Sequence, residues 1–164
     1  MIVPYDTPCG RLWVSGDHDT ISRVSWEIIE GIAHQGELDW ILFSLDRYFS
    51  REVEFFEGTL SFEGAEPLWK RRGDPVPPIT LAQRALHAIS CIPFGHPATY
   101  GEIAGAIGNP RLARFVGQIC KHNPLALIVP CHRVVARGSL GGYSPCLFRK
   151  EILLKHEGVD SGSI

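Results

Sequence analysis

Helix start signals are concentrated in the second half of this chain. Thr80 followed by Gln83, and Thr99 followed by Glu102, both have the spacing of a capping box, in which two side chains satisfy free backbone donors at a helix start. The first box predicts a helix that Pro93 ends, with an apolar face made of Leu81, Ala85, Leu86, Ala88 and Ile89.

A glycine-containing turn separates two further short helices. The second box opens a helix over residues 100–107, which Gly108-Asn109-Pro110 ends. Asn109 then caps a new helix with Pro110 at its first position, and Asn123-Pro124 ends that helix near His122. Two short helices around such a turn predict a helix-turn-helix.

The second of these helices has one basic face. At 100° per residue, four of its polar side chains fall within an arc of about 80°, and these are Arg111, Arg114, Gln118 and Lys121. Such a face is usually only solvated. Within a helix-turn-helix we interpret it as a surface that contacts phosphates.

The first half of the chain contains short stretches of alternating polar and apolar residues and one helical pattern. Residues 11–14 and 21–26 alternate around a turn at residues 16–20, which predicts a hairpin with one buried face, and residues 53–62 are a further candidate strand. Residues 37–50 have helical spacing of apolar side chains.

A polar, proline-rich segment at residues 71–78 is the best candidate linker. We therefore expect two domains. Residues 1–74 form a small α/β (α+β) domain, in which a helix packs on a small antiparallel sheet. Residues 75–164 form a mainly helical domain with the helix-turn-helix.

Charge is divided between these halves. Residues 1–80 hold 7 Lys and Arg against 14 Asp and Glu, whereas residues 81–164 hold 9 against 4, although the whole chain has a formal net charge of only −2. A basic half is typical of a protein that binds a polyanion such as nucleic acid. The alternative is that the two halves only attract each other.

Composition excludes several other classes. The chain is 45% hydrophobic and 21% charged, so it can bury a core. It has no apolar run long enough for a membrane helix and no signal-peptide pattern at its start. Five widely spaced cysteines without a CxxC pair argue against a disulfide framework, and we expect a reducing cytoplasm, or a nucleus in a eukaryote.

Cys131 is the candidate nucleophile. It follows a short apolar run and Pro130, and His132 and Arg133 come directly after it. Positive neighbours stabilise the thiolate form of a cysteine, so we expect an ionised sulfur at the mouth of a cavity. The alternative is a buried structural cysteine. A metal site is weaker still, with Cys9, His18 and His34 as its candidates.

The stretch from Pro93 to Gly158 resembles the C-terminal domain of the O6-alkylguanine-DNA alkyltransferases, the methylated-DNA–protein-cysteine methyltransferases. Six blocks carry the resemblance in the right order: TYGEIA at 99–104, ARFVG at 113–117, HNP at 122–124, PCHRV at 130–134, GYS at 142–144 and LLKHEG at 153–158. The first half resembles this family only in its size and its order of elements.

The resemblance implies one direct and irreversible transfer that needs no cofactor and no metal. Cys131 attacks the alkyl carbon on guanine O6 and keeps the alkyl group as a thioether, so that the protein acts once. In the family a glutamate–histidine–water chain activates the cysteine, which corresponds here to Glu157 and His132. Asn123 corresponds to an asparagine that joins the helix-turn-helix to the active-site loop, although it could also be a plain helix terminator. Arg133 corresponds to a residue that braces the active-site turn.

The resemblance also implies double-stranded DNA as the partner, bound through its minor groove by a monomer, with the damaged nucleotide flipped out. Arg114 corresponds to the finger that fills the vacated stack, and Tyr100 to a tyrosine that helps rotate the nucleotide, although Tyr100 could instead be a core aromatic. Ser144 with Tyr143 corresponds to a loop that donates to guanine O6. The carbonyls of Cys131 and Val134 accept from the exocyclic amine.

Some positions depart from the family pattern. Leu112 and Phe115 are bulkier than the small residues usual around the finger, which bears on the depth of groove insertion. Pro145-Cys146 replaces the usual Gly-Gly after Ser144, which stiffens the pocket loop and bears on the size of alkyl group accepted.

Two other functions remain as alternatives. A non-catalytic helix-turn-helix DNA-binding protein would not need Cys131, His132 and Glu157 together. A cysteine hydrolase would need an oxyanion-binding motif, and the sequence offers none.

Overall fold

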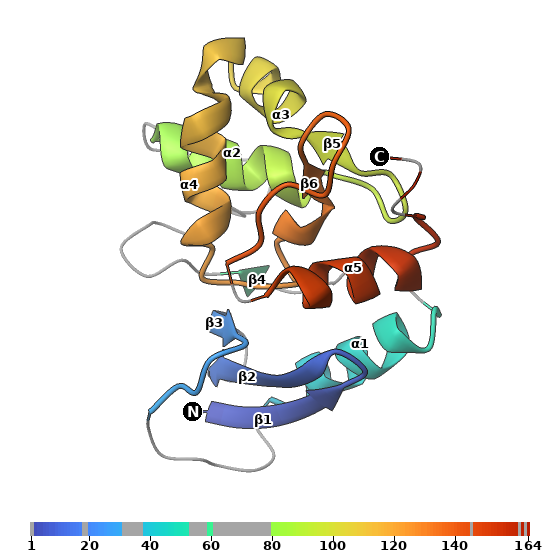
Figure 1. The fold of residues 1–164 in the computed structure, drawn as a ribbon. Helices are drawn as coiled ribbons and strands as arrows, with labels where there is room; N and C mark the ends of the chain where they lie inside the picture. The colour runs from blue at the N-terminus through green and yellow to red at the C-terminus, as the bar shows by residue number, and fades with distance from the viewer. Residues whose placement is uncertain are drawn as a thin grey trace. The chain divides into compact units, whose positions relative to one another are not determined.

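The computed structural model of the chain describes residues 2–17, 20–30, 38–52, 59–60, 80–144, 146–160, 162 and 164. The chain forms two compact units, which are Met1–Pro75 with Pro124–Ile128, and Val76–Asn123 with Val129–Ile164 (Figure 1). The first break lies one residue after the boundary expected from the sequence, but the return of residues 124–128 to the first unit was not predicted. The expected linker at residues 71–78 lies outside the described residues.

The first unit is built on a small sheet with the order β1-β2-β3-β4. Its strands are β1 (Ile2–Thr7), β2 (Gly10–Gly16), β3 (Thr20–Ser25) and β4 (Thr59–Leu60). The predicted hairpin is confirmed as the antiparallel pair β2–β3, and β1, which was not predicted, adds a second antiparallel pair. The expectation of an antiparallel sheet is wrong for β4, which pairs with β3 in parallel.

Alternation places Leu12 and Val14 of β2 on one face, and the register shift opposite Ser15 and Gly16 brings Ile21 and Val24 of β3, which are three residues apart, to that same face. Leu12 and Val14 of β2, and Ile21 and Val24 of β3, are almost completely buried. The predicted helix is α1 (Asp39–Phe49), which buries Ile41, Leu45 and Tyr48. Tyr5 of β1 joins the sheet to this helix, because its hydroxyl donates a 2.7 Å hydrogen bond to Asp46. The returning segment pairs with β3 through an isolated bridge between Val24 and Leu125.

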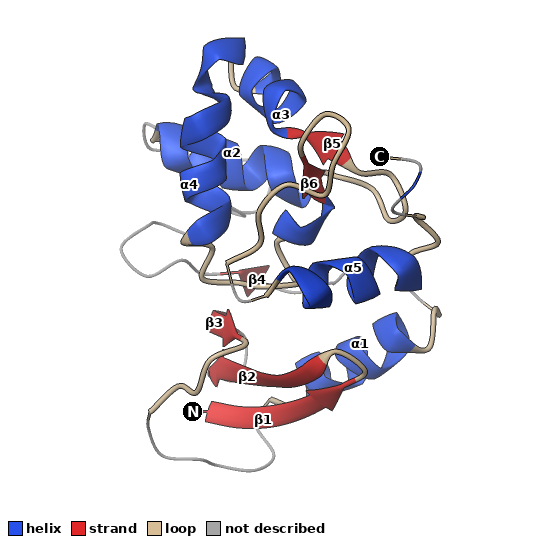
Figure 2. Ribbon diagram, in the orientation of Figure 1, coloured by secondary structure: helices blue, strands red, loops and turns tan. Residues whose placement is uncertain are grey.

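The second unit is mainly helical (Figure 2). Its α-helices are α2 (Leu81–Ser90), α3 (Tyr100–Ala106), α4 (Ala113–Lys121) and α5 (Leu147–His156). Two 3₁₀ turns, η1 (Pro110–Leu112) and η2 (Cys131–Arg133), and two short parallel strands, β5 (Ala98–Thr99) and β6 (Val134–Val135), complete it. This small parallel sheet was not predicted.

The predicted helix signals are present in this unit. Both capping boxes form at the starts of α2 and α3. Asn109 accepts a hydrogen bond from the Arg111 backbone, as expected of a cap, but the first turn it begins is 3₁₀ rather than α-helical. One prediction is wrong: Leu81 lies on the exposed side of α2, because position N1 precedes the turn whose side chains reach the core. In the described part of the chain no helix is long and apolar enough to span a bilayer.

Candidate active site

The turn η2 carries three buried side chains that can take part in a reaction. Cys131 and Arg133 are each 5% exposed and His132 is fully buried. The turn continues into β6, which pairs in parallel with β5, and α3 begins directly after β5. This pairing brings the start of α3, and therefore Tyr100, next to the cysteine turn.

Glu157, just after α5, is the centre of a buried ion cluster. Its Oε1 accepts a 2.8 Å hydrogen bond from His132 Nε2, and its two oxygens accept from Arg133 Nε and Nη2 at 2.9–3.1 Å. Arg133 Nη1 also donates to the Ile92 carbonyl at 2.6 Å. Burial raises the pKa of Glu157, but the bonds from His132 and Arg133 outweigh it and hold this pKa well below its usual range. Glu157 is therefore an anion at neutral pH.

The protonation states of Cys131 and His132 correct an expectation. Burial raises the pKa of Cys131, and the hydrogen bond from Asn123 and the charge of Lys150 offset only part of this effect. Burial lowers the pKa of His132 against the raising influence of Glu157. The resting site is therefore a thiol and a neutral imidazole, not the ion pair expected from the neighbouring charges. The charges of the neighbouring residues favour the thiolate, but the free-energy cost of removing the charged sulfur from water outweighs them.

The imidazole has a defined tautomer. Because Nε2 donates its proton to the Glu157 carboxylate, the neutral ring carries a lone pair on Nδ1. Nδ1 is buried and has no hydrogen-bond partner among the described residues. It is therefore a base ready to accept a proton.

Asn123 contacts the sulfur directly. Its side-chain nitrogen donates to the Val129 carbonyl at 2.8 Å and to Cys131 Sγ at 3.1 Å. The first bond is of the kind expected between the end of the second helix and the loop before the nucleophile. The second was not expected, and it favours the thiolate because it donates to the sulfur.

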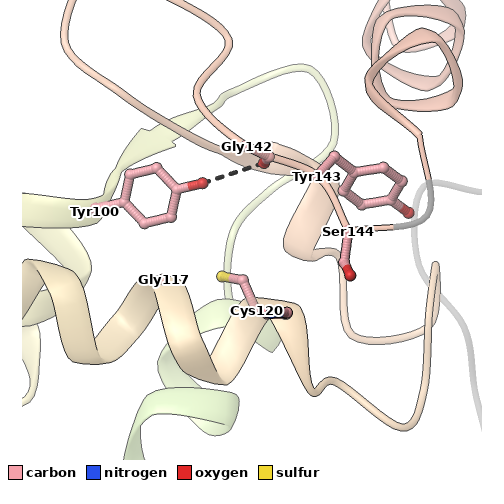
Figure 3. Close-up of a pocket in the computed structure, with 7 residues that line it drawn as sticks. Tyr100, Gly117, Cys120, Gly142, Tyr143 and Ser144 are labelled. Carbon is pink, nitrogen blue, oxygen red and sulfur yellow. Dashed lines mark hydrogen bonds between the residues drawn. The ribbon is translucent and has the colours of Figure 1, made fainter.

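A pocket of about 320 Å³ lies between α3, α4 and the loop before α5. Its lining consists of Tyr100, Gly117, Cys120, Lys121, Gly142, Tyr143 and Ser144. Figure 3 shows the Tyr100 hydroxyl pointing at the Gly142 carbonyl, to which it donates at 3.2 Å. Of the described residues, Cys131 and Val134 are not in this lining. The sulfur is buried and does not line this pocket, which corrects the expected position at its mouth.

The basic face of α4 and η1 is exposed as expected. Arg111, Arg114, Gln118 and Lys121 are all exposed, whereas Val116 on the opposite side is buried. Leu112 and Phe115 are half-buried, so part of their bulk packs inside the second unit. Gly117 lies between the two faces, and its Cα hydrogens face the Tyr100 ring.

The described residues include no cluster of His, Cys, Asp and Glu that could hold a metal ion. His18 and His34, two of the three weak metal candidates, lie outside the described residues. None of the five cysteines, all of which lie in the described residues, forms a disulfide.

Both a protein family and individual known proteins match this chain. Residues 80–159 match the family described as 6-O-methylguanine DNA methyltransferase, DNA binding domain. The methylated-DNA–protein-cysteine methyltransferase of Methanosarcina acetivorans is 34% identical over 168 residues, covering 94% of this chain and 96% of that protein. This chain belongs to that methyltransferase family.

Solved structures of the methyltransferase family match as well. The crystal structure of the Mycobacterium tuberculosis O6-methylguanine methyltransferase has a TM-score of 0.78 at 32% identity and covers 95% of this chain and 91% of its own. A second structure, of Mycobacterium tuberculosis OGT in complex with DNA, has a TM-score of 0.76 at 33% identity and covers 94% and 90%.

One buried residue of the site was not predicted from the sequence. Lys150 of α5 is fully buried, and its ammonium donates to the carbonyls of Val134 and Gly142 at 2.6 and 3.1 Å. A signal was present, because Lys150 lies three and four residues before Leu153 and Leu154, which are both buried. The position of Cys120 in the pocket lining was also not predicted.

Proposed function

We propose that this chain repairs double-stranded DNA by moving an alkyl group from guanine O6 to Cys131. The sulfur attacks the alkyl carbon, the new S–C bond forms as the C–O6 bond breaks, and the guanine leaves with the electron pair of that bond. The observation that carries the proposal is the pair of hydrogen bonds made by neighbouring residues of one buried turn, Cys131 with Asn123 and His132 with Glu157. The methyltransferase names of the relatives support it.

His132 receives the thiol proton in this scheme through a bridging water, as in the glutamate–histidine–water chain that the family resemblance implies, since no direct hydrogen bond joins its Nδ1 to the sulfur in the described residues. The neutral ring with its free Nδ1 lone pair is the form that a general base requires. Once protonated, His132 faces the Glu157 carboxylate, which Arg133 keeps ionised. Asn123 donates to the new thiolate. The proton transfer therefore creates two charges, and each of them has a partner in place.

The transfer is permanent. A thioether is a poor leaving group, and none of the residues that the structure describes supplies a group that could remove it, so each molecule acts once. The reaction requires neither cofactor nor metal, because displacement at carbon needs only the thiolate and a proton for the departing base.

The exposed face of α4 is the proposed DNA-binding surface, and the chain binds as a monomer. Arg111, Gln118 and Lys121 contact the phosphates from the minor-groove side, and Arg114 occupies the space that the flipped nucleotide leaves. The exposure of all four side chains and the relative solved in complex with DNA support this assignment.

The guanine enters the pocket beside Tyr100, whose hydroxyl is held by the Gly142 carbonyl. Tyr143 and Ser144 provide the loop that donates to O6, and the Val134 carbonyl accepts from the exocyclic amine. Val134 already accepts from Lys150, so the amine takes its second lone pair. Because Cys131 is buried and does not line this pocket, the base must move past the lining residues to reach the sulfur. The free cysteines suit a reducing cytoplasm, where we place the protein.

The stoichiometry of repair tests this function. The protein is mixed with an excess of duplex oligonucleotide containing O6-methylguanine, and the repaired strand is counted over time. We expect a burst that stops near one repaired guanine per protein, and no burst with Cys131→Ser. Repair that continues past one equivalent would indicate a hydrolase. Binding without repair would indicate a DNA-binding protein without chemistry, and either result overturns the proposal.

A further inference from the structure

Lys150 occupies a site that most lysines avoid. Its side chain is fully buried inside the second unit, although a buried ammonium is stable only when it is hydrogen-bonded. Nζ donates to the Val134 carbonyl at 2.6 Å and to the Gly142 carbonyl at 3.1 Å. These two carbonyls replace part of the water that the ammonium has lost.

The two carbonyls belong to different parts of the site. Val134 follows the cysteine turn directly, and Gly142 lies in the loop that lines the pocket. The Gly142 carbonyl also accepts the Tyr100 hydroxyl, and Lys150 Nζ lies 6.0 Å from the centre of the Tyr100 ring. One ammonium therefore joins the nucleophile turn, the pocket loop and the pocket tyrosine.

The positive charge of Lys150 affects the pKa values of the reacting groups. The titratable groups around it are Cys131 and His132 of η2, Cys120 of α4 and Tyr100 of α3. Its positive charge lowers the pKa of Cys131 against the effect of burial, and it also lowers the pKa of His132. Burial lowers the pKa of Lys150 itself to about 8, and negative charge on Cys131 or Cys120 raises it. Ionisation of Cys131 therefore favours the charged ammonium, and the two carbonyls that accept from Nζ favour it as well.

We propose that Lys150 is a positioning residue of this site: its ammonium fixes the Val134 and Gly142 carbonyls and so holds a positive charge at the end of the turn that carries Cys131, where it governs the reactivity of the thiol. The thiol part of this proposal is independent of the substrate. Only its consequence for alkyl transfer rests on the proposed function.

Four variants separate the charge from the hydrogen bonds. Lys150→Met removes both, Lys150→Gln keeps an amide donor without the charge, and Lys150→Arg keeps both. Lys155→Met, an exposed lysine of the same helix, is the control. The readout is the rate at which iodoacetamide alkylates Cys131 between pH 6 and 10, followed on the peptide that contains this residue, with thermal unfolding measured alongside.

We expect the two neutral variants to react more slowly at a given pH, because a neighbouring cation lowers the pKa of a thiol by roughly 1–3 units, which is about 10-fold to 1,000-fold in thiolate. Lys150→Arg recovers most of the rate, and Lys155→Met equals the wild type. Lys150→Gln recovers thermal stability relative to Lys150→Met but not thiol reactivity.

Two results overturn the proposal. One is a folded Lys150→Gln or Lys150→Met whose Cys131 reacts within about twofold of the wild type, because a change that small is below one pKa unit. The other is unfolding of both neutral variants while Lys150→Arg remains folded but its Cys131 reacts at least about 10-fold more slowly than in the wild type, because the retained positive charge then does not support thiol reactivity. Failure of the proposed function is distinguishable, since the wild type then reacts normally with iodoacetamide but takes no methyl group from DNA.

Discussion

Two regions of the second unit are rich in charge but use it in opposite ways. Around Glu157 the charged groups are buried, and each is held by hydrogen bonds from the chain itself. On the outer face of α4 and η1 the cations are exposed to solvent. The first arrangement changes protonation states, because burial magnifies every interaction between charges. The second is suited to attract a polyanion over a distance. A change in the buried region should therefore alter stability and chemistry on every substrate, whereas a change on the exposed face should alter only the reaction with DNA.

The largest effect is expected from Glu157→Gln. This change leaves Arg133 as a buried cation without its carboxylate, and removing one partner of a buried pair typically costs about 3–5 kcal/mol. The free energy of unfolding in urea measures the loss. Alkyl transfer should fall as well, on duplex DNA and on the free base O6-benzylguanine alike. Glu151→Gln on the exposed side of α5 is the matched control, and equal stability of the two variants would contradict the buried pair.

Acid should remove from the wild type the stabilisation that the Glu157 carboxylate provides. The pKa of Glu157 is lower in the folded chain than its unfolded value of 4.5, so the folded state binds fewer protons. Its contribution is complete above about pH 4.5 and is lost as the pH falls below that value. The stability difference between the wild type and Glu157→Gln should therefore shrink between pH 5 and pH 3 in urea titrations. A constant difference across this range would show that Glu157 does not titrate as the structure indicates.

A smaller and more selective effect is expected from Arg114→Ala. Flipping a nucleotide costs a few kcal/mol, part of which Arg114 offsets, so the transfer rate on duplex DNA should fall by roughly 10-fold to 100-fold. The rate on O6-benzylguanine should be unchanged, because no stack is opened. Arg84→Ala, an exposed arginine of α2, is the control. Equal losses on both substrates would show that Arg114 does not act through the DNA-binding surface. This result would contradict the contrast between the buried charges and the exposed face of α4 and η1.

The smallest effect is expected from Lys121→Ala. A lysine that contacts a phosphate contributes about one unit to the slope of log affinity against log salt concentration, and its loss weakens binding similarly for all sequences. Binding to an undamaged duplex at several salt concentrations gives this slope. Lys155→Ala on α5 should leave it unchanged, and an unaltered slope for Lys121→Ala would mean that this residue faces solvent in the complex.

Local features of the fold were predictable because their causes are local. The capping boxes of Thr80 and Thr99 act within four residues, and the exposed face of α4 follows from helical periodicity. Strand β1 was missed, since its residues bury only one end of the strand and contain Pro4. The return of residues 124–128 to the first unit depends on a backbone pair with Val24, a hundred residues away in sequence, which no local pattern reveals.

The site was predictable only through resemblance. No spacing rule joins His132 to Glu157, which are 25 residues apart, and the family motifs supplied this pair. The protonation states were predicted wrongly because desolvation depends on the packed structure and not on neighbouring letters. Lys150 was missed because a lysine in a helix is normally solvated, although its spacing of three and four residues from the buried Leu153 and Leu154 places it on the inner face of α5.

The destination of the alkyl group is the most direct measurement. The protein is incubated with a duplex in which the O6-methyl group is fully deuterated, and it is then digested with trypsin and weighed. The five cysteines fall in five different tryptic peptides, so the acceptor is identified without ambiguity. We predict one deuterated methyl group on the peptide of residues 122–133, located on Cys131. Label on Cys120, the thiol that lines the pocket, or on no cysteine, would contradict the account.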